Sequence, residues 1–300
     1  MTSPKVSVLM SVLNGEAYLA EAIDSVLAQT FEDFEFLIVD NASTDGTAAI
    51  IAAYDDKRIV HLRNPDTLNL SQSLNKGLAA ARGDYIARLD ADDIAMPERL
   101  EKQARFLAAH PDVALVASAW TDFGDGVPLP GTPGPVPPPD HDALVSALAR
   151  SSILAHSSIM FRRQAALDIG GYDEAYAYCM DYLLYFRLAE THGLAALPEP
   201  LVAVRVHAGQ ITQRPEWEAR RHREAAAAFR DILARGGLAS AVRAGLRRYL
   251  ILTCLRMTLL SLRTASPGKA ICWFGRALAV GPLLFICVVL SASCRRVQHA

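Results

Sequence analysis

Three carboxylates stand within four consecutive residues at Asp90-Ala91-Asp92-Asp93. Ionised carboxylates held this close repel one another, so such a cluster usually needs a cation. Oxygen ligands of this kind suit Mg²⁺ or Mn²⁺, which bind one or two carboxylates and complete their shell with substrate phosphates. The tetrapeptide therefore predicts a divalent-cation site. A solvated acidic turn is the alternative.

A fourth acid, Asp40, directly follows the apolar run 34–39. An acid at the end of the second strand of a nucleotide-binding fold commonly hydrogen-bonds a ribose or a base. The segment after the first predicted strand, Ser11–Glu16, contains no GxGxxG, which removes the best sign of a dinucleotide site. An Asx turn or a helix cap is the alternative role for Asp40.

The elements that must position these acids alternate between strand and helix patterns. Apolar runs predict strands at 6–13, 34–39, 58–62, 84–89 and 113–118. Helical spacing lies between them at 16–29, 46–54, 70–82 and 97–109. This alternation predicts an α/β fold, an open and mostly parallel sheet flanked by helices. Ligands of such sheets bind beyond the carboxyl ends of the strands, where the acids fall.

The second half of the chain begins with a proline-rich segment. Residues 128–139 hold seven prolines, too stiff for a helix or a central strand, so we expect an exposed loop or linker and an internal boundary. Beyond it the pattern predicts helices at 141–150, from Arg163 and at 180–192, and strands at 157–161 and 201–206. From Pro215 onward the pattern is helical.

Seven blocks, in this order, resemble the family 2 glycosyltransferases with the Rossmann-like GT-A fold. They are VSVLMSVLNGEAYLAEAIDSVLAQTF, FLIVDNASTDGT, LNKGLAAARGDYIARLDADDIAMPERL, HSSIMFRR, GGYDE, MDYLLYFRL and VRVHAGQIT. The resemblance covers about residues 4–212. It implies a nucleotide-sugar-binding half (1–125) and an acceptor-binding and catalytic half (126–212) of one domain. The helical pattern and the excess of basic residues predict a further, basic helical region (213–300).

The resemblance also implies the donor site. Its expected donor-binding residues are Val12, Leu13, Asn14, Glu16, Asp40, Lys76 and Asp90. Asp92 and Asp93 would hold the Mn²⁺ or Mg²⁺ ion that bridges the two phosphates. For Lys76 a solvated helical face is the alternative to a phosphate contact.

The implied catalytic base is Asp181. The family has a Glu-Asp pair at this helix start, and here Met180 replaces the Glu. One carboxylate suffices to deprotonate the acceptor hydroxyl in a single in-line displacement, which inverts the anomeric centre. A helix N-terminal acid is the alternative role for Asp181. His156 and His207 match positions near acceptor and diphosphate, and a structural histidine is the alternative for each.

The expected activity is metal-dependent transfer of one sugar from a nucleotide-diphosphate sugar, with UDP as the expected nucleotide. The acceptor would be a hydroxyl of a glycan or a lipid-linked acceptor in surface glycan or polysaccharide biosynthesis. The QxxRW string of processive synthases is not matched, because Glu216 precedes Trp217. The rivals are a non-catalytic GT-A-like binding module and a nucleotidyltransferase, which would normally show a glycine-rich basic loop after the first strand.

Charge divides the chain. Residues 1–200 carry 14 Lys and Arg against 28 Asp and Glu, whereas residues 201–300 carry 16 against 4. The apolar, arginine-flanked runs 246–263 and 276–296 predict surface helices on a membrane, a plain helical cap, or a short spanning helix. No motif for reading nucleic acid is present. The N-terminus lacks a signal-peptide pattern, so we expect a cytoplasmic protein, and surface helices in the tail would place it peripherally at the inner face of the cell membrane.

Overall fold

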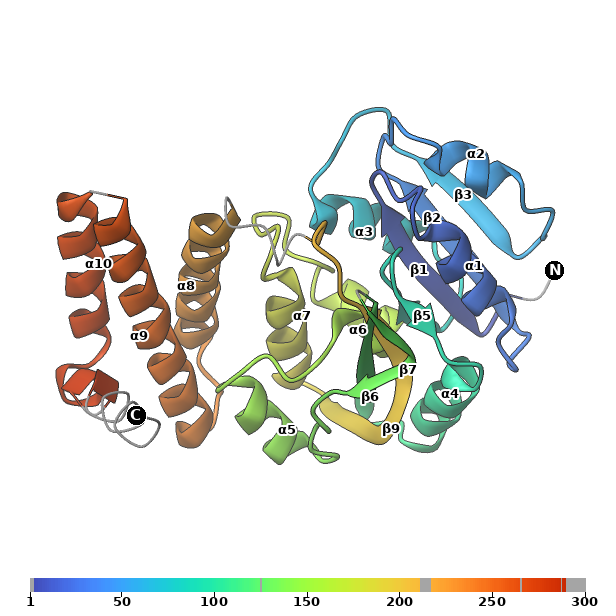
Figure 1. Cartoon of the computed structure of the whole chain (residues 1–300). Helices are drawn as coiled ribbons and strands as arrows, with labels where there is room; N and C mark the ends of the chain where they lie inside the picture. Colours follow the sequence, from blue (N-terminus) through green and yellow to red (C-terminus); the bar gives the residue numbers. More distant parts are fainter. Residues whose placement is uncertain (1–2, 125, 211–216, 265, 287, 290–300) are drawn as a thin grey trace. The chain divides into compact units, whose positions relative to one another are not determined.

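The structure, a computed structural model of the chain, describes residues 3–124, 126–210, 217–264, 266–286 and 288–289 (Figure 1). The chain divides into two compact units. The first comprises the residues up to Leu144 together with Ser152–His207, and the second comprises Val145–Ser151 and the residues from Ala208 onward. The first unit contains the sheet, and the second is helical.

The first part of the sheet is parallel. Strands β1 (Val6–Val12), β2 (Phe34–Asp40), β3 (Ile59–Arg63) and β4 (Tyr85–Arg88) are arranged in the order β3-β2-β1-β4. All three neighbouring pairs run parallel, so their carboxyl ends lie at one edge. The predicted α/β sheet is therefore confirmed, with strand limits close to those expected.

The second part of the sheet is mixed. Strand β8 (Met160–Arg162) runs antiparallel to both β4 and β6 (Val113–Gly124). Strand β9 (Gly193–Arg205) runs parallel to β6, and the short β5 (Ile94–Ala95) pairs antiparallel with β9. The prediction found only the end of β9. The strand starts earlier because its pairing with β6 continues across a register shift, where Pro200 interrupts the apolar pattern.

The proline-rich segment is not only a loop. Residues Val127–Pro133 form strand β7, which pairs only with β6, so the prediction of a loop or linker was wrong for these residues. Proline lacks the N–H that a central strand needs, but it fits an edge strand whose free side faces solvent. The first compact unit continues through this segment.

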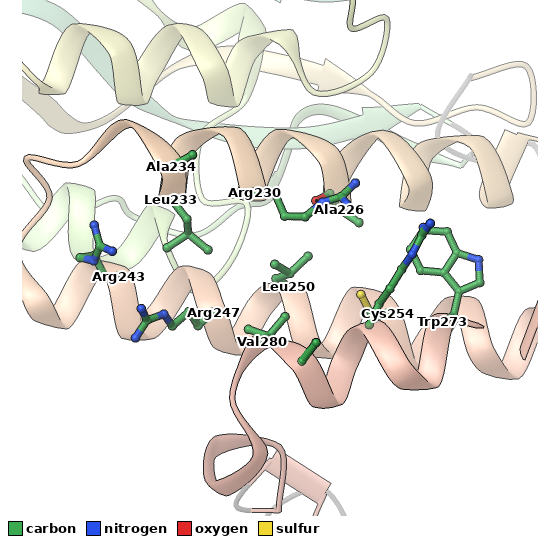
Figure 2. Close-up of a pocket in the computed structure, with 12 residues that line it drawn as sticks. Ala226, Arg230, Leu233, Ala234, Arg243, Arg247, Leu250, Cys254, Trp273 and Val280 are labelled. Atoms are coloured by element: carbon green, nitrogen blue, oxygen red, sulfur yellow. The ribbon is translucent and has the colours of Figure 1, made fainter. Parts of the chain in front are cut away.

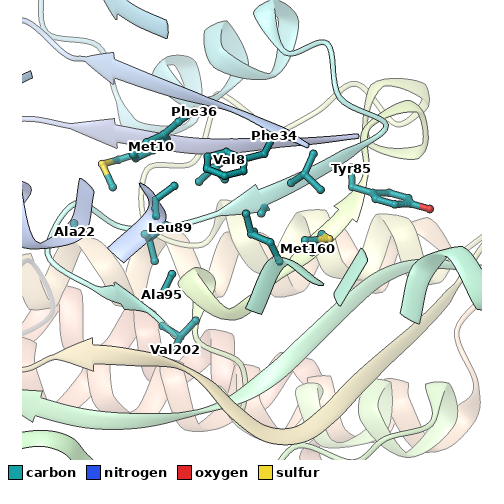
Figure 3. Packing of buried hydrophobic residues seen from close by; sticks show 14 of the residues in the cluster. Val8, Met10, Ala22, Phe34, Phe36, Tyr85, Leu89, Ala95, Met160 and Val202 are labelled. Carbon is teal, nitrogen blue, oxygen red and sulfur yellow. The ribbon is translucent and has the colours of Figure 1, made fainter. Parts of the chain in front are cut away.

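Strand β1 is buried on both faces, which explains its unbroken apolar sequence. One face packs against helix α1 (Leu19–Leu27) and belongs to the main hydrophobic core, to which α4 (Arg99–Ala109) also contributes (Figure 3). On the other face Leu9 meets helix α3 (Leu70–Ala80) at Gly77. The strand ends that carry the acids are therefore held between two layers of helices.

Short helices complete the first unit. They are α2 (Thr47–Ala52), α5 (His141–Leu148), a 3₁₀ turn (His156–Ser158), α6 (Arg163–Asp168) and α7 (Met180–Ala189). Helix α5 begins in the first unit and ends in the second. The predicted strand at 157–161 is wrong at its start, because the Ser158 N–H closes the 3₁₀ turn on the Ala155 carbonyl at 2.9 Å.

The second unit contains α8 (Glu218–Arg235), α9 (Ser240–Arg263) and α10 (Pro267–Val280), and α9 packs on both of the others. Across the described part of the chain, no helix combines the length and the apolar character that a membrane crossing requires. Helix α10 ends before Gly281, inside the apolar run 276–296. Residues 213–216 of the QxxRW-like string lie outside the described residues, as do residues 287 and 290–300.

The turn between α6 and α7 provides a matched test of packing. Gly170 and Gly171 both have positive φ, +84° and +71°. A Cβ on Gly171 would lie 2.6 Å from Asn75 Oδ1, whereas a Cβ on Gly170 would meet nothing within 4 Å. We expect Gly171→Ala to lower the free energy of unfolding by about 1–2 kcal/mol more than Gly170→Ala, measured by urea denaturation. Equal losses would contradict this contact.

Candidate active site

The acidic loop begins at a buried ion pair. The Arg88 side chain is 0% exposed, and its Nη2 donates to Asp90 Oδ1. The Asp90 N–H donates to Ser157 Oγ at 3.0 Å, which fixes the loop to the 3₁₀ turn. Burial alone would raise the pKa of Asp90, but the charge and hydrogen bond of Arg88 outweigh it and hold that pKa below its usual value. Asp90 is therefore stabilised as a carboxylate.

Asp93 points into the protein. The Ser157 hydroxyl lies within hydrogen-bond distance of its Oδ2, and its Oδ1 accepts the Arg205 N–H at 2.9 Å. Burial, followed by the charges of Asp90 and Asp92, raises the pKa of Asp93 well above its ordinary value. Both carboxylate oxygens of Asp93 thus have hydrogen-bond partners, and the contact with Arg205 attaches the acidic loop to β9.

The Asp92 side chain is 30% exposed, so this acid is partly open to solvent. Its Oδ2 lies 3.1 Å from His207 Nε2, directly after β9. Burial and the charge of Asp90 raise the pKa of Asp92, and the His207 contact opposes them. No group of three or more His, Cys, Asp or Glu side chains encloses a metal position in the residues described. The pair Asp90 and Asp92 still fits Mg²⁺ or Mn²⁺, which need only one or two protein carboxylates when phosphates complete the shell.

Asp181 lies at the start of α7 in the same charged neighbourhood. Its Oδ1 accepts the Tyr182 N–H at 2.8 Å. Burial raises the pKa of Asp181 to about 6, the charge of Asp90 adds to this, and the charge of Arg88 opposes it. A carboxylate of this basicity is better matched to taking a proton near neutral pH than an ordinary aspartate.

Two of the nitrogen donors of Arg88 form no hydrogen bond with the described residues. Its Nε and Nη1 are buried and have no hydrogen-bond partner among the described residues. Its charge acts on Asp90, Asp181 and His156. Buried donors without partners are costly, so the ion pair of Arg88 with Asp90 must offset that cost.

His156 is held neutral. Burial lowers its pKa well below the ordinary value, and the charge of Arg88 lowers it further. Its Nε2 lies 3.0 Å from the Tyr172 hydroxyl. Asn75 fixes Tyr172 in turn, because it accepts the Tyr172 N–H at 2.9 Å. The 3₁₀ turn, α3 and the glycine turn thus meet beside Arg88.

Asp40 ends β2 with one oxygen unused. Its side chain is 0% exposed, and its Oδ1 accepts the Ser43 N–H at 2.9 Å. Its Oδ2 has no hydrogen-bond partner within the described structure, although Arg63 Nε lies 3.6 Å away. Asp40 thus accepts from the backbone three residues on, one residue further than in the Asx turn given as an alternative role, and its Oδ2 accepts no hydrogen bond from the described residues.

The loops after β1 and β2 are joined to each other. Asn14 adopts φ +55°, which asparagine tolerates, and its N–H donates to Ser43 Oγ at 2.9 Å. Glu16 Oε2 accepts the Gly46 N–H at 3.0 Å. A Cβ on Gly15 would lie 3.9 Å from Ala91 Cβ, which shows that this loop borders the acidic loop. The predicted donor loop therefore lies beside the predicted metal loop.

Three predicted donor residues differ in exposure. Val12 is buried, Leu13 is 48% exposed, and Lys76 is exposed on α3. Exposure of Lys76 is compatible with either role given for it, a phosphate contact or a solvated helical face.

Sequence reasoning missed three residues that organise the site: Arg88, Ser157 and Arg205. Besides holding Asp93, Arg205 donates from Nε to the Asp92 carbonyl at 2.9 Å and lies over the ring of Tyr18, 4.5 Å from its centroid. All three occur inside blocks that carried the resemblance. The sequence blocks could therefore have pointed to these three residues, but not to the residues that they contact.

The Arg88–Asp90 pair gives a stability prediction. Arg88→Met leaves a partly buried carboxylate cluster without its counter-charge, so the free energy of unfolding should fall by about 3–5 kcal/mol. The matched control is Lys5→Met, which breaks an exposed pair with Asp84 and should change that free energy by less than about 1 kcal/mol. Chemical denaturation measures both. A loss for Arg88→Met no larger than the control would show that the pair is not needed.

Known proteins similar to this chain carry glycosyltransferase names. The chain is 38% identical over 179 residues to the putative glycosyltransferase EpsE of Bacillus subtilis, covering 57% of this chain and 61% of that protein. It is 29% identical over 217 residues to the amylovoran biosynthesis glycosyltransferase AmsE of Erwinia amylovora, covering 70% and 80%. The match to EpsE thus spans less than two thirds of that relative's length.

Solved structures of low sequence identity share the fold. Staphylococcus aureus TarS residues 1–349 in complex with UDP-GlcNAc gives a TM-score of 0.66 at 15% identity, covering 90% of each chain. The mannosyltransferase PcManGT of Pyrobaculum calidifontis, in complex with GDP-Man and Mn²⁺, gives 0.63 at 19% identity, covering 99% of this chain and 81% of that one. The family model for glycosyl transferase family 2 matches residues 7–170. With its fold, its acidic loop and this match, the chain belongs to glycosyltransferase family 2.

Proposed function

We propose that this protein is a divalent-metal-dependent, inverting glycosyltransferase that moves one sugar from a nucleotide-diphosphate sugar to an acceptor hydroxyl. The observation that carries the proposal is that two acids near Arg88, Asp90 and Asp181, have pKa values shifted in opposite directions. Asp90 is kept ionised by Arg88, whereas burial raises the pKa of Asp181 to about 6. One acid is suited to a cation site and the other to proton transfer.

The donor side of the proposal is the edge formed by β1, β2 and β4. Asp40 ends β2 with an oxygen that accepts no hydrogen bond from the described residues, and we assign this carboxylate to the base of the nucleotide. The Asn14–Glu16 loop lies between Asp40 and the acidic loop. The structural neighbours were solved with UDP-GlcNAc and with GDP-Man, which supports a nucleotide-sugar donor without selecting the base. We take UDP as the first nucleotide to test.

With Asp181 as the only base, sugar transfer proceeds as a single displacement. The acceptor oxygen attacks the anomeric carbon while its proton passes to the Asp181 carboxylate. The bond from that carbon to the diphosphate oxygen breaks on the opposite side, and its electron pair leaves with the nucleoside diphosphate. A single displacement of this kind inverts the anomeric centre. We assign orientation of the acceptor to the neutral His156 and the Tyr172 hydroxyl, which lie 3.0 Å apart.

Asp92, with Asp90 beside it, would hold the metal. A bound Mg²⁺ or Mn²⁺ stabilises the negative charge that the departing diphosphate gains, as a Lewis acid does. Asp93 keeps the loop attached to β9. His207 orients Asp92 through their 3.1 Å contact.

The acceptor and the location are also proposals. The name of AmsE includes a biosynthetic pathway, which supports a role in surface glycan or polysaccharide production. The helical unit exposes large apolar side chains, including Leu259, Leu262, Ile271 and Phe274. Together with the excess of arginine, these support peripheral binding at the inner face of the cell membrane and a glycan or lipid-linked acceptor.

One experiment separates donor binding from transfer. Thermal shift with UDP and Mn²⁺ should show stabilisation, about 2.7 kcal/mol at one hundred times the dissociation constant, that EDTA removes. Asp92→Asn should lose this shift. Asp181→Asn should keep it and lose about 10²–10⁴-fold in turnover of UDP-sugar, followed as UDP release.

The control is Asp168→Asn, an exposed acid of α6, which should behave as wild type. Release of pyrophosphate instead of a nucleoside diphosphate would establish the nucleotidyltransferase alternative. Binding without any turnover would establish the binding module.

The pH profile tests the base directly. Asp181 accepts a proton only when ionised, and burial raises its pKa to about 6. We therefore expect kcat to rise with pH through about 6 and then level, measured with saturating donor and Mn²⁺. Arg88 opposes the raised pKa, so its removal should move the inflection to higher pH. A kcat without an inflection near pH 6 would contradict the assignment of Asp181.

A further inference from the structure

A cavity of about 450 Å³ lies between α8, α9 and α10 in the helical unit (Figure 2). Its floor is apolar and buried, formed by Ala226, Leu250, Cys254 and Trp273. Its rim carries four guanidinium groups, from Arg230, Arg243, Arg247 and Arg276. No part of the proposed reaction uses this cavity.

The sequence of α9 builds one side of the cavity. Arg243, Arg247, Leu250 and Cys254 follow one another at intervals of four, three and four residues. Such spacing places side chains on a single stripe of a helix. Two arginines at one end and two apolar residues further along therefore face the same cavity from α9.

The rim charges have no carboxylate to balance them. No ion pair joins these four arginines to an acid within the described residues, and no acid follows Asp231 in the chain. Arg230 donates from Nε to the Ala226 carbonyl at 3.0 Å, and the Arg276 guanidinium lies 4.6 Å from the Trp273 ring centroid. Burial raises the pKa of the Cys254 thiol, and the charges of Arg230 and Arg276 oppose that rise.

We infer that this cavity binds the phosphate head group of an anionic membrane lipid. The arginines would bind the phosphate oxygens, and the first methylenes of the lipid would lie on the apolar floor. A free phosphate would satisfy the rim and leave the floor uncovered. Two of the three helices that form the cavity also expose apolar side chains, Leu262 on α9 and Ile271 and Phe274 on α10. Exposed apolar side chains of this kind suit a membrane surface.

Binding of the full-length chain to vesicles tests the inference. The vesicles are phosphatidylcholine with and without phosphatidic acid, and bound protein is measured by co-sedimentation. We expect binding only when phosphatidic acid is present. The test variant is Arg243→Ala with Arg247→Ala. Its matched control is Arg256→Ala with Arg263→Ala, which removes the same charge from exposed positions of α9 that do not line the cavity.

The two double variants distinguish a site from a charged surface. Two arginines near an anionic surface are worth roughly 30-fold in affinity wherever they lie, so both variants should lose that much. The site predicts a further loss of about tenfold for the cavity variant, because specific contacts to phosphate are also lost. Equal losses in the two variants would overturn the inference, as would no binding to either vesicle.

A second measurement separates lipid from free phosphate. Short-chain phosphatidic acid, soluble in water, should raise the Tm of the wild type but not of the cavity variant. Inorganic phosphate that raises Tm equally would overturn the lipid assignment. The inference extends the proposed membrane contact but needs no turnover, and the thermal shift with UDP and Mn²⁺ stays intact in both variants. Failure at the cavity is thus distinguishable from failure of the proposed function.

Discussion

The buried guanidinium of Arg88 is the charge on which the acidic edge of the sheet depends. Asp90, Asp92 and Asp93 lie within four residues, and Asp181 adds a further carboxylate to the neighbourhood. Without a buried positive charge, burial and mutual repulsion would raise the pKa of each acid and neutralise the cluster. Among the described residues, Arg88 forms its ion pair with Asp90, so it stabilises the ionised form of this acid, while the pKa values of Asp92 and Asp93 stay raised. One arginine thereby creates acids with different properties on one scaffold.

The mixed half of the sheet holds this arrangement in place. Antiparallel β8 follows the turn that carries Ser157, and β9 delivers Arg205 and His207 to the acidic loop. Arg99 holds the backbone just before the acidic loop, because its Nη2 donates to the Arg88 carbonyl at 2.6 Å. Burial and the charge of Arg88 lower the pKa of Arg99 to about 9. The site therefore depends on contacts between the acidic loop and the end of β9, which are more than a hundred residues apart in the chain.

The acids of the site could be predicted from sequence, because their signal is local. Asp40 and Asp90 follow apolar runs, and parallel strands bring such endings together. Their partners could not be predicted, because periodicity does not say which residue of a distant strand approaches. Arg205 meets Asp93 across 112 residues of chain, and Ser157 meets Asp90 across 67. The start of β9 was missed for a related reason, since its pairing with β6 shifts register where Pro200 breaks the pattern. The bias of the tail toward arginine was visible, but the cavity that gathers four of them required the helix packing.

The edges of the sheet bear on how the protein behaves at high concentration. An open strand edge presents free N–H and C=O groups that can recruit a strand from another molecule. Strand β7 has prolines at 128, 130 and 133, which have no N–H to offer, and β5 is only two residues long. At the opposite edge β3 has five residues and ends in the charged Arg63. Each of these edges is thus short, charged or blocked by proline, so the sheet itself resists growing from one molecule into the next.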